Sequence, residues 1–305
     1  DKTVFYGEGG GQVGDTGVIV TAEGACLKVT DTKKTNGIYI HECKLESGSV
    51  RVGDVVLASI DADRRNAIRR NHSSAHLLQA ALREVLGTHV EQAGSYVDEK
   101  RVRFDFTHLQ AMTAEEIAKV EAIVNESILL AESCSTTVTD IKSAREMGAM
   151  ALFGEKYGDV VRVVKAGDFS TELCGGTHVD NAGKLGLFKI VSESSVASGV
   201  RRIEAVTGKG VVEYIASLNS LIANTARAMK LGNVNELERK AVAMAAELKE
   251  KEREIAALSA QLTDLKSADI FSAPEQIGAV KLIIARAEDM SADELLEGVD
   301  ISKME

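Results

Sequence analysis

The chain contains 305 residues, 46 of them acidic and 36 basic, which gives a formal net charge of −10. This length allows about two or three domains with buried cores, and 45% apolar with 27% charged residues excludes a disordered chain. No apolar run is long enough for a transmembrane helix, so we expect no membrane partner. The four cysteines lie far apart without a CxxC pair, which indicates a reducing, cytoplasmic setting.

Residues 1–60 have the pattern of short strands and tight turns. Runs of β-forming residues at 18–20, 37–40 and 55–57 are separated by glycine, aspartate, asparagine and lysine. Several short strands in a segment of this length predict a small β-barrel-like module.

Residues 61–208 mix helices and strands. Apolar residues follow helical spacing from Asp61 to Gly87, a typical C-terminal cap, and a capping box at Thr113 predicts a second amphipathic helix. Strands are expected at 89–97, 101–107, 135–139, 160–165, 186–195 and 200–206. The fold class is therefore α+β, with a two-layer α/β core.

Residues 209–268 predict a long antiparallel helical hairpin. Its second helix has apolar residues at alternating steps of four and three, a heptad pattern interrupted only by Lys251, and Asn235 is expected to cap it. The break between the helices is expected at 231–233. Such an arm serves as a spacer or as a surface for self-association. After Pro274, a strand at 280–285 and a helix from Ser291 are expected.

Two short motifs contain four of the ten histidine and cysteine residues. His72 and His76 are four apart on the first helix, so both imidazoles lie on one face. On its own, such a pair is more often structural than metal-binding. Cys174 and His178 form a second cluster in a glycine-rich turn, and one cysteine with three histidines is a ligand set suited to zinc. Taken together, the two motifs favour a metal site.

The segment GEGGGQVGDTG (residues 7–17) is the most glycine-rich part of the chain. It contains the pattern GxGxxG, but a strand follows at 18–20 where a dinucleotide-binding turn requires a helix. Gly10, Gly11 and Gln12 either form a turn that needs positive φ angles or contact a substrate. The sequence pattern leaves both possibilities open.

Polar residues elsewhere are also candidates for the site. Gln92 shares a strand face with Val90, so its amide either faces a pocket or is exposed. Arginines cluster ahead of His72, and these either form a solvated face or bind a phosphate-bearing substrate: Arg64, Arg65, Arg69 and Arg70.

Several ordered motifs together resemble the editing region of the alanyl-tRNA synthetase family. They are RNHSSAHLL at 70–78, RFDFTH at 103–108 and ELCGGTH at 172–178. The glycine-rich segment 5–17 and GVRRIE at 199–204 resemble the start and end of the same region. The resemblance covers residues 1–208, and the helical region with its tail is similar, less distinctively, to the family's C-terminal part. Free-standing editing proteins share the two metal motifs and are the close alternative.

The resemblance implies a role for individual residues. The zinc (Zn²⁺) ligands would be His72, His76, Cys174 and His178. Cys174 and Gln92 match positions that the family uses in editing, and Thr16 matches a hydroxyl that contacts the side chain of serine. Gly10, Gly11 and Gln12 would lie at the substrate, and Arg69 and Arg70 would bind tRNA.

The implied reaction is hydrolysis of the ester that joins serine or glycine wrongly to tRNA(Ala). A domain that binds ATP and alanine is expected ahead of residue 1, and the helical or C-terminal region is a possible site of homo-oligomerisation. The expected domains are a β module at 1–60, a zinc-containing editing core at 61–208, a helical hairpin at 209–268 and the truncated start of a C-terminal globular domain at 269–305.

Two other functions fit parts of the pattern. The chain is alternatively a non-catalytic arm for tRNA binding and oligomerisation, with an inert metal holding its core together. A metallopeptidase is disfavoured, because Ser73 stands where such an enzyme has its glutamate. Four protein ligands would close a zinc site, whereas loss of one to water or substrate would open it. The sequence does not choose between the closed and the open site.

Overall fold

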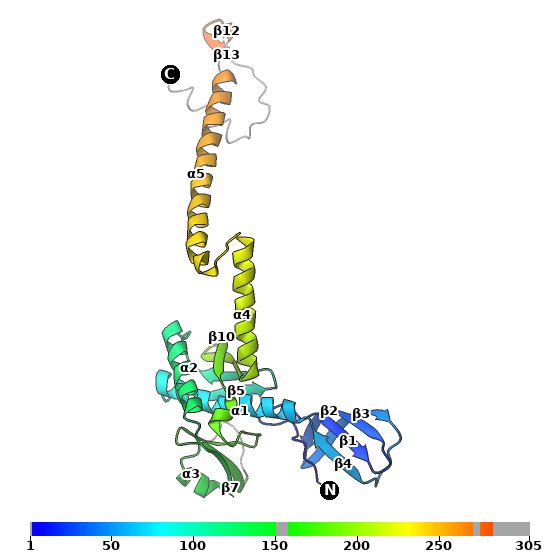
Figure 1. The fold of residues 1–305 in the computed structure, drawn as a ribbon. Coiled ribbons are helices and arrows are strands. Elements are labelled where there is room, and N and C mark those ends of the chain that lie inside the picture. Colours follow the sequence, from blue (N-terminus) through cyan, green and yellow to red (C-terminus); the bar gives the residue numbers. More distant parts are fainter. Residues whose placement is uncertain (1, 151–157, 271–274, 283–305) are drawn as a thin grey trace. The chain divides into compact units, whose positions relative to one another are not determined.

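The computed structural model describes residues 2–150, 158–270 and 275–282. The chain divides into two compact units, Asp1–Ser217 and Leu218–Glu305, which are described separately below. The first unit contains three antiparallel sheets with helices, and the second is mainly helical (Figure 1). The mixture of helices with antiparallel sheets confirms the expected combination of α and β structure.

The first sheet is open and has the strand order β3-β2-β1-β4. Its strands are β1 (Gly17–Thr21), β2 (Cys26–Thr35), β3 (Ile38–Ser47) and β4 (Val56–Ile60). The expected barrel-like closure is not confirmed, because the described edge strands β3 and β4 do not pair. A physical reason is strand length: β2 and β3 have ten residues and β1 has five, so the outer half of the β2–β3 hairpin pairs only with itself.

The turn between β2 and β3 shows why glycine is needed at one position. Asn36 and Gly37 both have positive φ angles, 52° and 81°. This is the backbone of the two-residue hairpin turn that Asn-Gly favours, since its twist matches that of the strands. β2 itself is not evident from the sequence, because polar residues fill most of its outer half.

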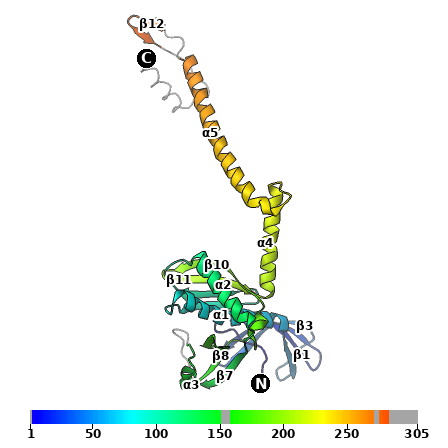
Figure 2. The same cartoon turned by 60° about the vertical axis from the view of Figure 1, so that its left-hand side comes forward.

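The main core lies between the second sheet and two helices. The sheet has the order β10-β11-β6-β5, and α1 and α2 both contact it (Figure 2). The elements are α1 (Ala62–Leu86), β5 (Gln92–Val97), β6 (Val102–Thr107), α2 (Ala114–Leu129), β10 (Phe188–Ala197) and β11 (Val200–Thr207). Phe104 and Phe106 of β6 are fully buried against Leu78 of α1 and Val120 of α2. Burying such side chains contributes about 1.5–3 kcal/mol each.

The ends of the first two helices follow the sequence signals. Asp61 caps α1 by accepting a hydrogen bond from the Arg64 backbone N–H, and Gly87 ends the helix with a φ of 115°. Thr113 and Glu116 form the expected reciprocal capping box at α2. Local capping therefore sets where α1 and α2 begin and where α1 ends.

The third sheet has the order β7-β8-β9 and carries the cysteine-containing loop. Its elements, with their neighbours, are β7 (Cys134–Asp140), α3 (Ile141–Glu146), β8 (Val160–Ala166), β9 (Ser170–Leu173) and the short 3-10 helix η1 (Ala182–Leu185). β9 contacts α1, so the loop that leaves β9 at Cys174 meets the face of α1 that holds His72.

The helices near the C-terminus differ from the expected hairpin. They are α4 (Lys209–Ala228), η2 (Val234–Glu236) and α5 (Leu237–Ile270), followed by β12 (Glu275–Ile277) and β13 (Val280–Leu282). An antiparallel pairing is not confirmed, since heptad residues of α5 are exposed, including Leu248, Ile255, Leu258 and Leu265. A seam along α5 needs a partner of similar length, but α4 has 20 residues and α5 has 34.

The predicted cap of the second helix was wrong. Asn233, not Asn235, caps η2, because the Asn235 backbone N–H donates to the Asn233 side chain. The short 3-10 turn moves the cap two residues ahead of the expected position. β13 lies in the predicted strand at 280–285, while residues 283–285 and the helix expected from Ser291 lie outside the described residues.

Neither membrane spans nor disulfides form among the described residues. None of the helices that the structure describes has the length and apolarity to cross a membrane. Cys26, Cys43, Cys134 and Cys174 are free thiols.

Candidate metal centre

Two segments about a hundred residues apart bring three histidines and a cysteine together. His72 and His76 lie on the same buried face of α1, and Cys174 and His178 lie in the loop after β9. One possible ligand atom from each of the four residues lies within 4.8 Å of all the others. The structure therefore assembles the complete set that the two motifs predicted.

The spacing of these atoms suits a tetrahedral metal ion. The Cys174 Sγ atom is 3.4 Å from His72 Nε2 and 3.2 Å from His178 Nε2. A zinc ion about 2.3 Å from sulfur and about 2.0–2.1 Å from nitrogen holds those two atoms about 3.5 Å apart. These two distances match a bound zinc ion, whereas the ligand atoms that are farther apart, by up to 4.8 Å, would move closer to share it.

Each histidine is oriented by a hydrogen bond to its Nδ1 atom. His72 Nδ1 contacts Gln12 Oε1 at 2.7 Å, and His76 Nδ1 contacts Glu172 Oε2 at 2.5 Å. His178 Nδ1 contacts the Ser73 hydroxyl at 3.2 Å. Partners of this kind fix the tautomer and orientation of metal-binding histidines.

The orientation leaves one buried nitrogen without a partner. His76 Nε2 is fully buried and has no hydrogen-bond partner among the residues described. A buried polar atom without a partner is costly. A metal ion among the four residues would satisfy it, so the residues present fit a metal of the zinc type.

The electrostatics of the metal-free cluster favour two ligands in their binding forms. Burial raises the pKa of the Cys174 thiol, but the charge of His72 and hydrogen bonds from His72 and His178 outweigh it and hold the pKa far below its usual value. Burial and the charge of His72 lower the pKa of His178 to about 3. A thiolate and a neutral imidazole are the forms that bind metal.

His76 is held in its protonated form when no metal is bound. Burial opposes its protonation, yet the Glu172 carboxylate and Cys174 raise its pKa to about 10. A metal ion must therefore displace a proton from this residue. Glu172 in turn accepts a hydrogen bond from Ser170 Oγ at 3.1 Å, which fixes the carboxylate beside the ring.

Backbone carbonyls of the cysteine-containing loop are held by two arginines. Arg69 donates to the carbonyl of His178, and Arg162 donates to the carbonyls of Cys174 and Gly176. The Arg69 guanidinium, predicted to contact tRNA, is thus engaged with the loop. Arg70 points elsewhere, to a groove beside Gly208.

The glycine-rich segment lies against both β5 and the metal centre. Gly10 and Gly11 adopt positive φ angles of 58° and 79°, so the turn does need glycine. A side chain at position 11 would overlap Ser95 of β5. Gln12 is fully buried, and its Oε1 atom accepts hydrogen bonds from the Thr177 backbone N–H and hydroxyl as well as contacting His72.

Of the other two residues expected at the substrate, Thr16 belongs to this segment and Gln92 to β5. Gln92 is half-buried, and its amide donates to Ser95 Oγ at 3.2 Å. Thr16 lies where the segment enters β1, and its carbonyl accepts the Asp61 backbone N–H at the start of α1. Within the described structure, neither side chain has a hydrogen bond to the four clustered residues.

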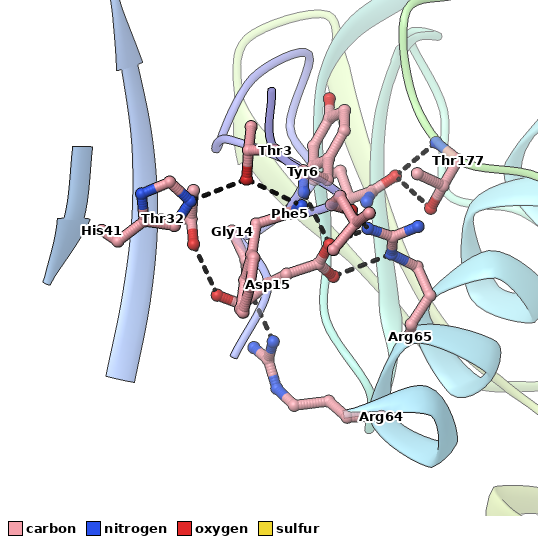
Figure 3. A network of polar contacts seen from close by, with 12 residues as sticks. Thr3, Phe5, Tyr6, Gly14, Asp15, Thr32, His41, Arg64, Arg65 and Thr177 are labelled. Carbon is pink, nitrogen blue, oxygen red and sulfur yellow. Dashed lines mark hydrogen bonds and ion pairs between the residues drawn. The ribbon is translucent and has the colours of Figure 1, made fainter. Parts of the chain in front are cut away.

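A buried ion pair fastens the glycine-rich segment to α1 (Figure 3). Asp15 accepts hydrogen bonds from the Arg65 guanidinium and from the Tyr6 backbone N–H. The Thr32 hydroxyl donates to the Asp15 carbonyl at 2.9 Å, and Arg64 donates to the Gly14 carbonyl at 2.8 Å. These contacts place Gln12 against His72.

Several residues of the site were not identified from the sequence. Two of them orient histidines, Glu172 at His76 and Ser73 at His178. Arg162 holds the loop that carries Cys174 by donating to its carbonyl. Tyr6 is a fourth: burial and the charge of Cys174 raise its pKa to about 12, so its phenol stays protonated and donates to the Gly9 carbonyl. A carboxylate two residues before a suspected metal-binding cysteine was the one signal available for Glu172.

Comparison with known proteins identifies relatives for almost the whole chain. The family described as "Threonyl and Alanyl tRNA synthetase second additional domain" matches residues 161–204, which include Cys174 and His178. The family "tRNA synthetases class II (A)" matches residues 1–64. Alanine–tRNA ligases from Acetivibrio thermocellus, Bacillus velezensis and Bacillus subtilis are 49%, 47% and 46% identical over 97%, 95% and 95% of this chain. The chain belongs to the alanyl-tRNA synthetase family.

The match covers only part of these relatives. The chain spans about a third, 33%, of the length of each of the three ligases. It therefore corresponds to one section of an alanyl-tRNA synthetase, and the four clustered residues lie in that section.

Gly176 offers a sharp test of the geometry of the centre. A methyl group at this position would overlap the His72 ring and lie 3.0 Å from Gln12 Oε1, whereas a methyl group at Gly175 has no atom within 4 Å. We expect Gly176→Ala to weaken zinc binding about 10- to 100-fold, the range for lost supporting contacts, and Gly175→Ala to leave it unchanged. Competition with a chromophoric zinc chelator measures both. Equal affinities for the two variants would show that His72 is not a ligand.

Proposed function

We propose that this section of the synthetase is an editing deacylase, which hydrolyses the ester of serine or glycine wrongly attached to tRNA(Ala). The observation that supports the proposal is the cluster of His72, His76, Cys174 and His178. A hydrogen bond to the Nδ1 atom orients each of the three histidines. Membership of the alanyl-tRNA synthetase family supplies the substrate class, and the match to the second additional domain covers two of the four residues.

Aminoacyl esters are reactive, so the protein mainly has to position the ester and a water molecule. The four clustered residues would hold Zn²⁺, which supplies charge to organise the pocket and, if one ligand gives way, to polarise an oxygen. In this proposal Thr16 and Gln92 hold the serine side chain and the water. Gly10 lets the backbone approach the substrate closely, because it has no side chain and no atom lies within 4 Å of where one would begin. Gly11 supports this turn by packing against Ser95 at a φ angle that favours glycine.

The partner in this proposal is tRNA(Ala), and the setting is the cytoplasm. In the whole synthetase, a separate section would attach alanine with ATP, and the section described here would remove wrongly attached amino acids. Gln12 supports the centre rather than binding the amino acid directly, because its Oε1 atom is occupied by His72 and Thr177.

The test is release of serine from Ser-tRNA(Ala) by the 305-residue chain, with Ala-tRNA(Ala) as the matched control. We expect Ser-tRNA(Ala) to be hydrolysed faster than Ala-tRNA(Ala), because Thr16 and Gln92 offer hydrogen bonds that only the serine side chain can complete. Equal rates would contradict the proposed role of these two residues. Absence of hydrolysis above the buffer rate would contradict the deacylase activity of the chain.

The alternative of a non-catalytic arm is favoured by one observation. All four clustered residues lie close enough to bind a single ion, and a site with four protein ligands is typical of structural zinc. Both functions predict bound zinc, but only the deacylase predicts hydrolysis. A free-standing editing protein is less consistent with the relatives, since these are ligases that match nearly the whole chain.

A further inference from the structure

A hollow lies on a different face of α1 from the metal centre. It is bounded by the first turns of α1, the turn between β5 and β6, η1, and the junction of β11 with α4. All these parts belong to the unit Asp1–Ser217. We call this hollow the α1–α4 groove.

The groove is rich in basic side chains although the chain is acidic overall. Its basic lining residues are Arg64, Arg70, Lys100, Lys184 and Lys209, and its acidic ones are Asp63, Glu99 and Glu213. Two of the basic groups are already engaged, because Arg64 pairs with Glu99 and Lys184 pairs with Asp180. Across the described ranges, Arg70, Lys100 and Lys209 form no ion pair or side-chain hydrogen bond, so their charges are available.

The start of α4 adds backbone donors to the same place. Gly208 has a φ of 51°, and Lys209 begins α4 directly after it. In the described structure, the backbone N–H groups of Lys209 and Gly210 do not donate to any backbone carbonyl. Such donors at the first turn of a helix, with its positive dipole end, favour phosphate. Arg70 supplies a second, independent charge, because its Nε atom lies 3.2 Å from where a side chain at Gly208 would begin.

Two hydrogen bonds connect the elements that form the floor of the groove. The Thr207 hydroxyl donates to Asn71 Oδ1 at 2.6 Å, and the Asn71 amide donates to the Asp98 carbonyl at 2.8 Å. Thr207 and Asn71 are both buried. These bonds hold the end of β11, α1 and the β5–β6 turn together, so the charged groups on these elements have fixed anchor points.

The helix α1 contributes residues to both the groove and the metal centre. Asp63, Ala67 and Arg70 face the groove at helical spacing, while His72 and His76 face the metal centre. With a rise of about 1.5 Å per residue, Arg70 and His76 are about 9 Å apart along the helix axis. A strand of a few nucleotides can span that distance.

We propose that the α1–α4 groove binds backbone phosphates of the RNA strand whose 3′ end lies at the metal centre. The proposal rests on the proposed function for the class of ligand, and on the groove's own charges for the place. Arg70, Lys209 and the N–H groups at the start of α4 contact the phosphodiester. Glu213 limits the affinity, because it places a carboxylate beside the same helix end.

The experiment measures binding of an RNA hairpin with a single-stranded 3′ overhang and no amino acid attached, by fluorescence anisotropy over a range of salt concentrations. We expect Arg70→Gln and Lys209→Gln each to weaken binding about 3- to 10-fold and to lower the salt dependence by about one phosphate contact. Glu213→Gln should strengthen binding. The matched controls are Lys44→Gln and Lys142→Gln, which remove exposed charges outside the groove.

Two results would overturn the proposal. One is unchanged affinity in both groove variants, and the other is an equal loss in groove and control variants, which would show general charge attraction. Thermal unfolding identifies any variant that fails to fold. In that case Glu213→Gln tests the proposal, because it is expected to raise the affinity for RNA, which loss of folding cannot do. Because the RNA carries no amino acid, binding and hydrolysis are tested separately. Binding that depends on the groove residues, without hydrolysis of Ser-tRNA, contradicts only the proposed deacylase activity. Hydrolysis of Ser-tRNA, with RNA binding that does not depend on the groove residues, contradicts only the proposed role of the groove.

Discussion

Replacing Cys174 by alanine should remove the metal ion from the purified chain and lower the hydrolysis of Ser-tRNA(Ala) by at least about 100-fold. The physical reason is that the Cys174 Sγ atom lies against both His72 and His178, and its thiolate is the only negative ligand of the four. Loss of a supporting residue alone costs about 10–100-fold in affinity or activity, and loss of a ligand costs more.

The matched control is Cys43→Ala, since Cys43 is an exposed cysteine on β3 of the same unit. Metal content by mass spectrometry and serine release are measured on both variants. The control should keep one metal ion per chain and full activity. Ser-specific hydrolysis by Cys174→Ala after its metal has been stripped would contradict a role for the metal centre in the reaction.

Replacing Asp15 by alanine should destabilise the first unit by about 3–5 kcal/mol. Asp15 is 2% exposed and forms a buried ion pair with Arg65, whose side chain is 16% exposed. Removing one partner of such a pair leaves an uncompensated buried charge, which has an effect of this size. The substitution also removes the hydrogen bond that the Tyr6 backbone N–H donates to the Asp15 side chain.

Tyrosine fluorescence during urea unfolding measures this loss, because all five tyrosines lie before residue 218 and the chain has no tryptophan. The control is Glu254→Ala, which removes an exposed ion pair with Lys251 on α5 and should change stability by less than about 1 kcal/mol. A loss below about 1 kcal/mol in Asp15→Ala would show that the ion pair does not hold the glycine-rich segment in place.

The features predicted correctly from the sequence depend on neighbours along the chain. Asp61 and Gly87 end α1 by local capping, and His72 with His76 share a face because residues four apart do so in any helix. The HxxxH and CGGTH motifs were sufficient to predict the clustered set, since each motif is short and the ligand chemistry restricts the combination.

The features that were missed depend on contacts across the fold. Gln12 meets His72 across 60 positions and Asp15 meets Arg65 across 50, so neither pair has a local pattern. Closure of the first sheet also has no local pattern, because it depends on how far β2 and β3 extend past β1. The predicted antiparallel pairing of α5 with the helix before it is not confirmed, because a heptad pattern alone does not specify which helix packs against it.

The measurement that tests the central claim most directly is serine release from Ser-tRNA(Ala) by one preparation of the chain in three states: as purified, after removal of metal, and after return of one equivalent of zinc. A metal centre that organises the hydrolytic pocket predicts activity in the first state, its loss in the second and its recovery in the third. Equal rates in the stripped and zinc-loaded states would contradict that account.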